Sequence, residues 1–377
     1  MTLSEEHAQI REQARRFADG AIRPVSADLD RTERFPAEIY HQMAELGLFG
    51  ITVPEKDGGA GADALAYALV MEELARGYAS VADQCGLVEL VATLLVEHGT
   101  PAQKECYLAP LLRAERRCAY ALTEAEAGSD LASIRTTAVR SAQGWRLDGG
   151  KLWIHNAPLC DFAAVLARTD PAQGHRGMSV FLVDRDLPGV EAGPKEEKMG
   201  QRASPVGALH FAGVELPEDA LLGPEGRGFH MMMSVLDKGR IGIAALALGI
   251  AGAALDAAVE QAHTRRQFGQ AVADFQGIQW LLADMAMEIE AARLLVHAAA
   301  GAMARGERAT LQASMAKCFA SDVAVRRISD AVQIFGGSGY IRGFEVERLY
   351  RDAKITQIYE GTNQIQRSLI ARHLLKG

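Results

Sequence analysis

Glu360 is the residue whose surroundings most clearly indicate chemistry. It lies in the tetrapeptide Tyr359-Glu360-Gly361-Thr362 and is the only acid after Asp352. Its neighbours carry apolar or amide side chains, and a carboxylate buried among such groups has a raised pKa and is a stronger base. Such a base suits the removal of a proton from a carbon beside a carbonyl. The alternative is an acid at the start of a helix, favoured by the helix dipole, and this segment alone does not decide between the two.

Four other segments combine polar side chains with glycines or aromatic rings. They cover residues 120–130, 151–157, 265–270 and 333–339. Glycine allows close backbone approach, hydroxyl groups can bind a cofactor, and cations beside an aromatic ring can clamp a diphosphate and stack on a base. Each segment also has an ordinary explanation: a turn after a strand, a core tryptophan, a solvated helix end and a helix C-cap.

Several common catalytic patterns are absent from the sequence. There is no Walker A loop, no H-E-x-x-H and no G-x-S-x-G, and the segment 337–342 lacks the third glycine of a G-x-G-x-x-G pattern. The five cysteines, Cys85, Cys106, Cys118, Cys160 and Cys318, have no metal-binding spacing. These absences disfavour a Rossmann dinucleotide site, P-loop chemistry and a metal centre.

The composition is that of an ordinary globular protein, with 49% hydrophobic and 23% charged residues over 377 positions. The net charge of -8 argues against nucleic acid as the main partner. The longest uncharged apolar stretch, 241–255, is shorter than the roughly 18 residues that span a membrane. An odd number of unpatterned cysteines favours a reduced, cytoplasmic protein.

The chain has three regions of different texture. Residues 1–118 show helical periodicity, residues 119–222 show short alternating and β-branched runs between turns, and residues 223–377 return to long alanine-rich helical segments. The predicted fold class is α+β and mostly helical, with an N-terminal helical domain, a middle antiparallel β-domain and a C-terminal helical bundle. The small-residue faces also favour an oligomer. The long helices are expected at 228–264, 275–304 and 311–335.

Taken together and in this order, the motifs make the chain resemble the acyl-CoA dehydrogenase family from about residue 3 to residue 375. The resemblance implies an N-terminal helical domain, a middle β-domain and a C-terminal four-helix bundle. The residues that carry it are Ala121-Leu122-Thr123-Glu124, Ala127-Gly128-Ser129-Asp130, Lys151 with Trp153-Ile154, Lys198-Met199-Gly200, Arg265 with Phe268-Gly269, Gln333-Ile334-Phe335-Gly336-Gly337 and Tyr359-Glu360-Gly361-Thr362.

The resemblance also implies an activity, a cofactor and partners. Family members bind FAD without a covalent bond, and most are homotetramers. They oxidise an acyl-CoA thioester to the 2,3-enoyl thioester: a carboxylate takes the α-proton, the β-hydride passes to flavin N5, and the electrons go to an electron-transfer flavoprotein.

Carried onto this sequence, the resemblance makes Glu360 the catalytic base, and its backbone N–H would bind the thioester carbonyl. The residues expected at FAD are Leu122, Thr123, Gly128, Ser129, Trp153, His155, Arg265, Phe268, Gln333, Gly337, Thr362 and Gln364, of which Arg265, Phe268, Gln333 and Gly337 would reach the cofactor of a neighbouring subunit. The residues expected at the substrate are Ser129, Asp237, Arg240, Tyr359 and Gly361.

Three positions bear on this assignment. A branch of the family carries its base where this chain has Gly239, which leaves Glu360 as the family-position base. His155 stands where the family usually has a threonine that bonds the flavin, so it either substitutes for that threonine or alters flavin potential, oxygen reactivity or substrate space. Glu89 lies in a helix that corresponds to the family's acyl-pocket wall. A buried acid at this position would favour a polar or cationic acyl group, but an acid in a helix lies more often on the solvated face.

Three other functions remain open at this point. The first is dehydrogenation of acyl groups bound to a carrier protein. The second is an oxidase or a flavin monooxygenase of the same fold; retention of Glu360 argues against most of these. The third is a non-catalytic flavin-binding scaffold, which the complete motif set disfavours.

Overall fold

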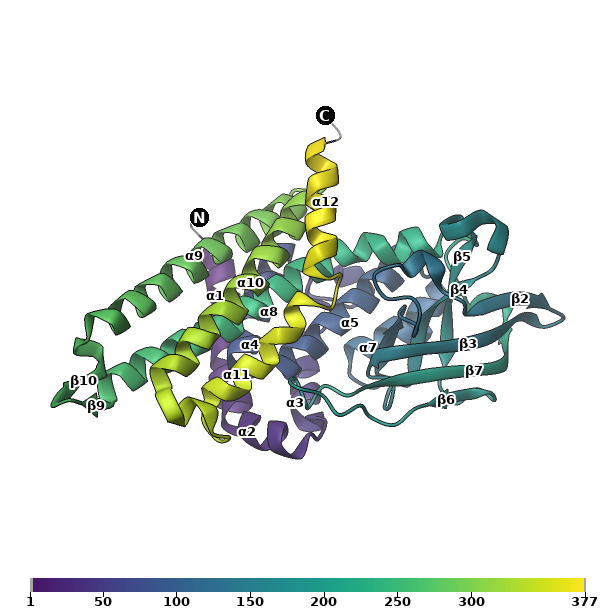
Figure 1. The fold of residues 1–377 in the computed structure, drawn as a ribbon. Helices are drawn as coiled ribbons and strands as arrows, with labels where there is room; N and C mark the ends of the chain where they lie inside the picture. Colours follow the sequence, from purple (N-terminus) through teal and green to yellow (C-terminus); the bar gives the residue numbers. More distant parts are fainter. Residues whose placement is uncertain (1–2, 376–377) are drawn as a thin grey trace.

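The N-terminal part of the chain is helical. The computed structural model describes residues 3–375, and Figure 1 shows the helical part and a β-domain side by side. The side chain of Ser4 caps the first helix by accepting from the His7 N–H, and Asp63 caps α4 in the same way through Ala66. The helices here are α1 (Glu5–Phe17), α2 (Arg23–Thr32), α3 (Ala37–Glu45), α4 (Ala64–Gly77), α5 (Ala79–His98), α6 (Pro101–Gln103) and α7 (Ala109–Leu112), with a π-helical turn at Ala18–Ile22 and another at Lys104–Leu108.

The middle of the chain folds into one sheet with the strand order β6-β7-β3-β2-β4-β5-β8, and β1 pairs with β4. The strands are β1 (Cys118–Ala121), β2 (Thr137–Ser141), β3 (Gly144–His155), β4 (Phe162–Arg168), β5 (Met178–Asp184), β6 (Val190–Ala192), β7 (Val206–Pro217) and β8 (Leu221–Leu222).

The expectation of an antiparallel sheet requires a correction. Most neighbouring strands are antiparallel, but β4 pairs in parallel with β1 and, at one residue pair, with β2. The sheet is therefore mixed. Alternation of side chains shows that a segment is a strand, but not the direction of its partner, so the sequence pattern could not reveal the two parallel pairings.

The C-terminal part is helical again, and its long helices begin and end within one residue of the predicted positions. The helices α8, α9 and α10 pack against one another, and α12 packs against α10. The elements are α8 (Gly228–Thr264), β9 (Arg266–Gln267), β10 (Gln270–Ala271), α9 (Gln276–Ala304), α10 (Thr310–Phe335), α11 (Glu345–Lys354) and α12 (Asn363–Leu375).

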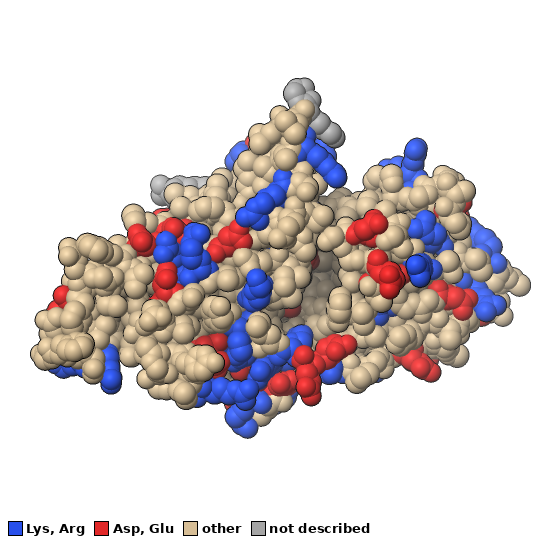
Figure 2. Space-filling view, viewed as in Figure 1, with Lys and Arg blue, Asp and Glu red and all other residues tan. Residues whose placement is uncertain are grey.

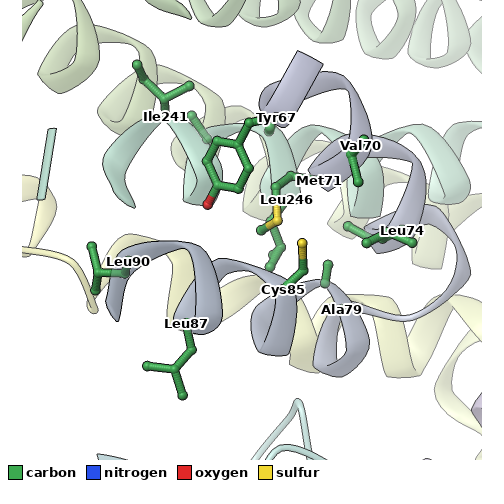
Figure 3. Packing of buried hydrophobic residues seen from close by; sticks show 14 of the residues in the cluster. Tyr67, Val70, Met71, Leu74, Ala79, Cys85, Leu87, Leu90, Ile241 and Leu246 are labelled. Carbon is green, nitrogen blue, oxygen red and sulfur yellow. The ribbon is translucent and has the colours of Figure 1, made fainter. Parts of the chain in front are cut away.

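The core of the helical part lies where α8 packs against α4 and α5. Figure 3 shows Tyr67 and Met71 of α4, Cys85 of α5 and Leu246 of α8 within this core. By length and composition α5 and α8 could each cross a membrane, but most of each apolar window is buried inside the protein. Burial on all sides explains why these helices are apolar all round.

Candidate active site

Glu360 lies in a turn that the surrounding structure holds in an uncommon conformation. The turn joins the 3-10 segment Ile355–Gln357 to α12, and Glu360 has a φ of 55°. A left-handed backbone is costly for a residue other than glycine, so it persists only where neighbouring contacts impose it. Gly361 follows with a φ of 87°, a value that glycine adopts readily.

Glu360 is half-buried, and its carboxylate points at α8 with one oxygen that is buried without a partner among the described residues. Its Oε2 atom makes no hydrogen bond within residues 3–375. A Cβ atom on Gly239 would lie 2.6 Å from this oxygen, so the absence of a side chain at Gly239 makes room for the carboxylate. A base at position 239 would therefore occupy the space that the Glu360 carboxylate fills.

Four effects act on the pKa of the Glu360 carboxyl. Burial is the largest, and together with the nearby charge of Asp83 it raises the pKa to about 7, against the opposing effects of Arg240 and Lys317. A carboxyl poised near neutral pH is a suitable general base. The predicted rise in pKa of Glu360 is therefore present in the structure, and its main cause is the loss of water.

The main-chain N–H of Glu360 is a second unused group at this point. It donates no hydrogen bond within residues 3–375, although Ile358 and Tyr359 just before it both donate to Ile355. A free N–H next to a buried carboxylate could bind a carbonyl oxygen on which negative charge develops.

The residues of the β-domain that were expected at the cofactor lie around the end of β3. Trp153 has a φ of 55° within an irregular register between Lys151 and Ile154, and its indole is 62% exposed. The buried Lys151 ammonium donates to the Leu122 carbonyl at 2.9 Å and to Glu124 at 2.7 Å, which fixes the turn that precedes Gly128. An exposed indole beside an anchored turn is a surface that a planar ring system could cover.

His155 lies next to Trp153 in a polar network. Its Nε2 atom is 2.6 Å from the Ser204 hydroxyl and 2.8 Å from the Gln84 amide nitrogen, and its Nδ1 atom is 3.4 Å from Asp83. Gln84 also pairs with Asn156 through two amide hydrogen bonds. Burial lowers the pKa of the imidazole, so His155 is neutral at physiological pH.

The two halves of the site are joined by the loop before β7. Gln201 of this loop lies 3.4 Å from the Tyr359 hydroxyl, and Ser204 of the same loop contacts His155. Gly200 lies directly against the backbone of Arg351 and Asp352, where a Cβ atom would collide. Figure 2 shows a hollow in the surface between α12 and the β-domain, on the side where the turn before α12 faces β3.

Two residues expected at the substrate contact each other beside Glu360. Arg240 is buried and donates to Asp237 at 2.6 Å, and Asp237 also accepts from Thr310 at 2.5 Å. The role of Arg240 and Asp237 at the CoA part of a substrate stays a prediction, and so do the roles of Ser129, Tyr359 and Gly361.

Four expected cofactor residues lie elsewhere in the chain. Arg265 and Phe268 lie at the β9–β10 hairpin, which Figure 1 places at the end of the molecule opposite the β-domain. Phe268 is 94% exposed, and Gln333 and Gly337 are exposed at the end of α10. Arg265 and Phe268 thus lie far from β3 of the same chain. The role of all four residues at the cofactor of a neighbouring subunit stays a prediction. Thr362 and Gln364 lie within and just after the Glu360 turn.

The sequence reading of Glu89 preferred a solvated face, and the structure corrects it. Glu89 is fully buried, and its Oε1 atom accepts from the Thr52 N–H at 3.1 Å and lies 3.6 Å from the Lys238 ammonium. Thr93 also accepts from Lys238, at 2.9 Å. Thr52 and Lys238 thus compensate Oε1 of the acid, while its Oε2 atom is buried without a hydrogen-bond partner among residues 3–375. The helical pattern alone did not show these partners.

Sequence reasoning missed several residues that hold the site. They are polar side chains inside apolar helices or loops, the same pattern that distinguishes Glu89. They are Asp83, Gln84, Gln201, Ser204, Lys317 and Gln366.

Comparison with known proteins shows what the chain is similar to. Family models for the N-terminal, middle and C-terminal domains of acyl-CoA dehydrogenase match residues 4–115, 119–214 and 226–375. An acyl-CoA dehydrogenase of Bacillus subtilis is 46% identical, with all of both chains covered. A 3-(aryl)acrylate reductase of Clostridium sporogenes is 44% identical, again with all of both chains covered. A short-chain specific mitochondrial acyl-CoA dehydrogenase of Bos taurus is 44% identical and covers 99% of this chain and 91% of that protein.

Solved structures give the same picture. A chain from the structure of the electron-transferring flavoprotein of Acidaminococcus fermentans has a TM-score of 0.98 at 43% identity, with all of both chains covered. Butyryl-CoA dehydrogenase of Megasphaera elsdenii has a TM-score of 0.96 at 42% identity over 100% of this chain and 99% of that chain. PigA with FAD and proline has a TM-score of 0.96 at 29% identity over all of both chains.

Proposed function

The chain belongs to the acyl-CoA dehydrogenase family, and we propose that it oxidises the Cα–Cβ bond of a short-chain, medium-chain or branched acyl-CoA thioester with Glu360 as the base. The observation that carries this proposal is the carboxylate of Glu360, which places a buried, unpartnered oxygen beside Gly239 and has a pKa raised by burial to about 7. The relatives of similar length include a short-chain specific enzyme, which supports a short acyl group.

The residues of this chain divide the work of the reaction. Glu360 takes the α-proton, and the electron pair left on Cα forms the new double bond as the β-hydrogen leaves as hydride. The free N–H of Glu360 binds the thioester carbonyl and stabilises the negative charge that develops on its oxygen. The anchored turn around Leu122 and the exposed face of Trp153 would hold the cofactor against which the acyl group reacts.

FAD is the cofactor, in agreement with the FAD-bound relative and the family. When bound, it accepts the hydride from the β-carbon. The exposed indole of Trp153, the hydroxyl of Thr123 and the open backbone at Gly128 fit such a group, because a Cβ atom on Gly128 would meet nothing within 4 Å. His155 would lie at the ring edge as a neutral imidazole.

The proposed assembly is a homotetramer. Its support is a row of exposed apolar side chains along one face of α9: Trp280, Met287 and Leu294 are 62%, 63% and 49% exposed. Residues seven apart lie on the same face of a helix, and such a row in water favours a partner. Arg265 and Phe268 would then reach the FAD of a neighbouring subunit. An electron-transfer flavoprotein is the proposed electron acceptor.

Anaerobic titration of the purified protein with acyl-CoA thioesters tests the proposal. We expect butyryl-CoA or an acyl-CoA of similar length to bleach the visible absorbance of the oxidised flavin. Bleaching only by acyl groups on a carrier protein would favour the carrier-bound reaction instead. Rapid reoxidation by oxygen would favour an oxidase, and no bleaching by any thioester would reject the dehydrogenase function.

A further inference from the structure

Lys317 places a buried cation next to the turn that carries Glu360. It lies in the first third of α10, and its side chain is completely buried. The ammonium donates to the Gly361 carbonyl at 2.8 Å and to Asn363 Oδ1 at 3.0 Å. These two acceptors are neutral oxygens on the turn and on the first residue of α12.

Neutral acceptors compensate only part of the cost of burying an ammonium group. Burial lowers the pKa of Lys317 to about 8, and the charge of Glu360 is the main effect that opposes this change. In return, the charge of Lys317 helps to lower the pKa of Glu360. Each of the two buried charges therefore favours the charged form of the other.

The contacts of Lys317 also bear on the backbone of the turn. Two successive carbonyls, those of Glu360 and Gly361, both accept from the Gln366 amide, at 3.1 Å and 3.0 Å. Lys317 provides the second donor to Gly361, and it does so from a different helix. The left-handed conformation of Glu360 is thus fixed from α12 by Gln366 and from α10 by Lys317.

We propose that Lys317 is a positioning residue for the catalytic base: it ties α10 to the Glu360 turn, holds the carboxylate over Gly239 and places a positive charge close to it. The proposal rests on the proposed role of Glu360. No contact of Lys317 with the substrate is required, because it acts through the backbone and the charge of the turn.

Lys317→Met removes both the charge and the donors at similar length, and Arg327→Met is the matched control. Arg327 lies on the same helix, but it pairs with Glu288 and Asp330 away from the turn. We expect Lys317→Met to lower kcat about tenfold or more while KM changes little, because a small misplacement of a reacting group is costly. The acid limb of its pH profile should move to higher pH, and Arg327→Met should leave that limb in place.

Lys317→Gln separates the contribution of the charge from that of the hydrogen bonds, since glutamine keeps an N–H donor but carries no charge. It should move the acid limb as Lys317→Met does and lose less of kcat. The other charged groups that face Glu360, Asp83 from α5 and Arg240 from α8, are unchanged in all variants. An unmoved limb with kcat within twofold of wild type in a folded Lys317→Met protein would overturn the proposal.

Hydrogen exchange of the wild-type turn tests the clamp independently of activity. The hydrogen-bonded amides of the turn, those of Ile358, Tyr359, Ile365 and Gln366, should be protected while Lys317 is protonated, and protection corrected for intrinsic rate should fall as pH rises above about 8. Cys318, Asp322, Arg240 and Glu360 are the other titratable groups around Lys317. Unchanged protection across this range would contradict the clamp even if the substitutions prevent folding, and it would do so whether or not an acyl-CoA reduces the flavin.

Discussion

The carboxyl of Glu360 should give the activity and the stability opposite dependences on pH. Its pKa is raised by burial to about 7, and the base works only when deprotonated, so kcat/KM should rise with pH through about 7. The folded state binds this proton more tightly than the unfolded chain, whose glutamate has a pKa of about 4.3. The contribution of Glu360 to stability is therefore fully present below that value and is lost as pH rises through about 7. Denaturation of wild type and Glu360→Gln across pH 5–9 should show wild type losing stability relative to the variant, and parallel curves would contradict the raised pKa.

At the same scale, His155 should tune the cofactor rather than act as the base. Its neutral imidazole is held by Gln84 and Ser204, with Asp83 3.4 Å away. His155→Thr introduces the hydroxyl that the family usually has at this position, but it removes the imidazole beside Asp83. We expect a shift in flavin midpoint potential or oxygen reactivity, with turnover of an artificial acceptor retained. Spectroelectrochemistry measures the potential, and complete loss of α-proton exchange with solvent would show instead that His155 takes part in proton removal.

At the scale of elements, the glycines of α8 set how closely α4 can approach. A Cβ atom on Gly242 would lie 2.8 Å from Cζ of the buried Tyr67 ring, which Figure 3 shows within the core. A rigid ring cannot move aside, so Gly242→Ala should destabilise the protein by about 1–3 kcal/mol. Gly277→Ala is the control, because Gly277 lies in α9 with nothing within 4 Å of the new methyl group. Equal stability of the two variants in chemical denaturation would show that α8 and α4 can separate freely.

The elements also show what the sequence could and could not predict. The long helices 228–264 and 311–335 were predictable because their alanine-rich helical pattern continues over many turns. The direction of β1 relative to β4 was not, because pairing direction depends on contacts between strands distant in sequence. Glu360 was recognisable as a lone acid in a recurring motif. Asp83 and Lys317 were not, since a polar residue in a helix has the same appearance in sequence whether it faces water or a buried site.

At the scale of the whole molecule, the exposed row on α9 should mediate assembly. Met287→Glu places a charge in the middle of this row and should dissociate the tetramer into smaller species, as measured by light scattering. The same variant should release FAD more readily, because Arg265 and Phe268 are expected to act on a neighbouring subunit. Val139→Glu is the control, since Val139 is 52% exposed on the β-domain. A wild-type protein that is monomeric yet holds FAD tightly would contradict the assembly.

Anaerobic flavin reduction by Glu360→Gln is the most direct test of the account. The substitution keeps the shape and hydrogen-bonding capacity of the side chain but removes the base beside Gly239. The variant should bind FAD and a thioester substrate as wild type does, while the rate of flavin bleaching in a stopped-flow experiment should fall by about 10² to 10⁴-fold, the usual contribution of a positioned general base. Bleaching at a rate near that of wild type would contradict both the mechanism and the assignment of Glu360.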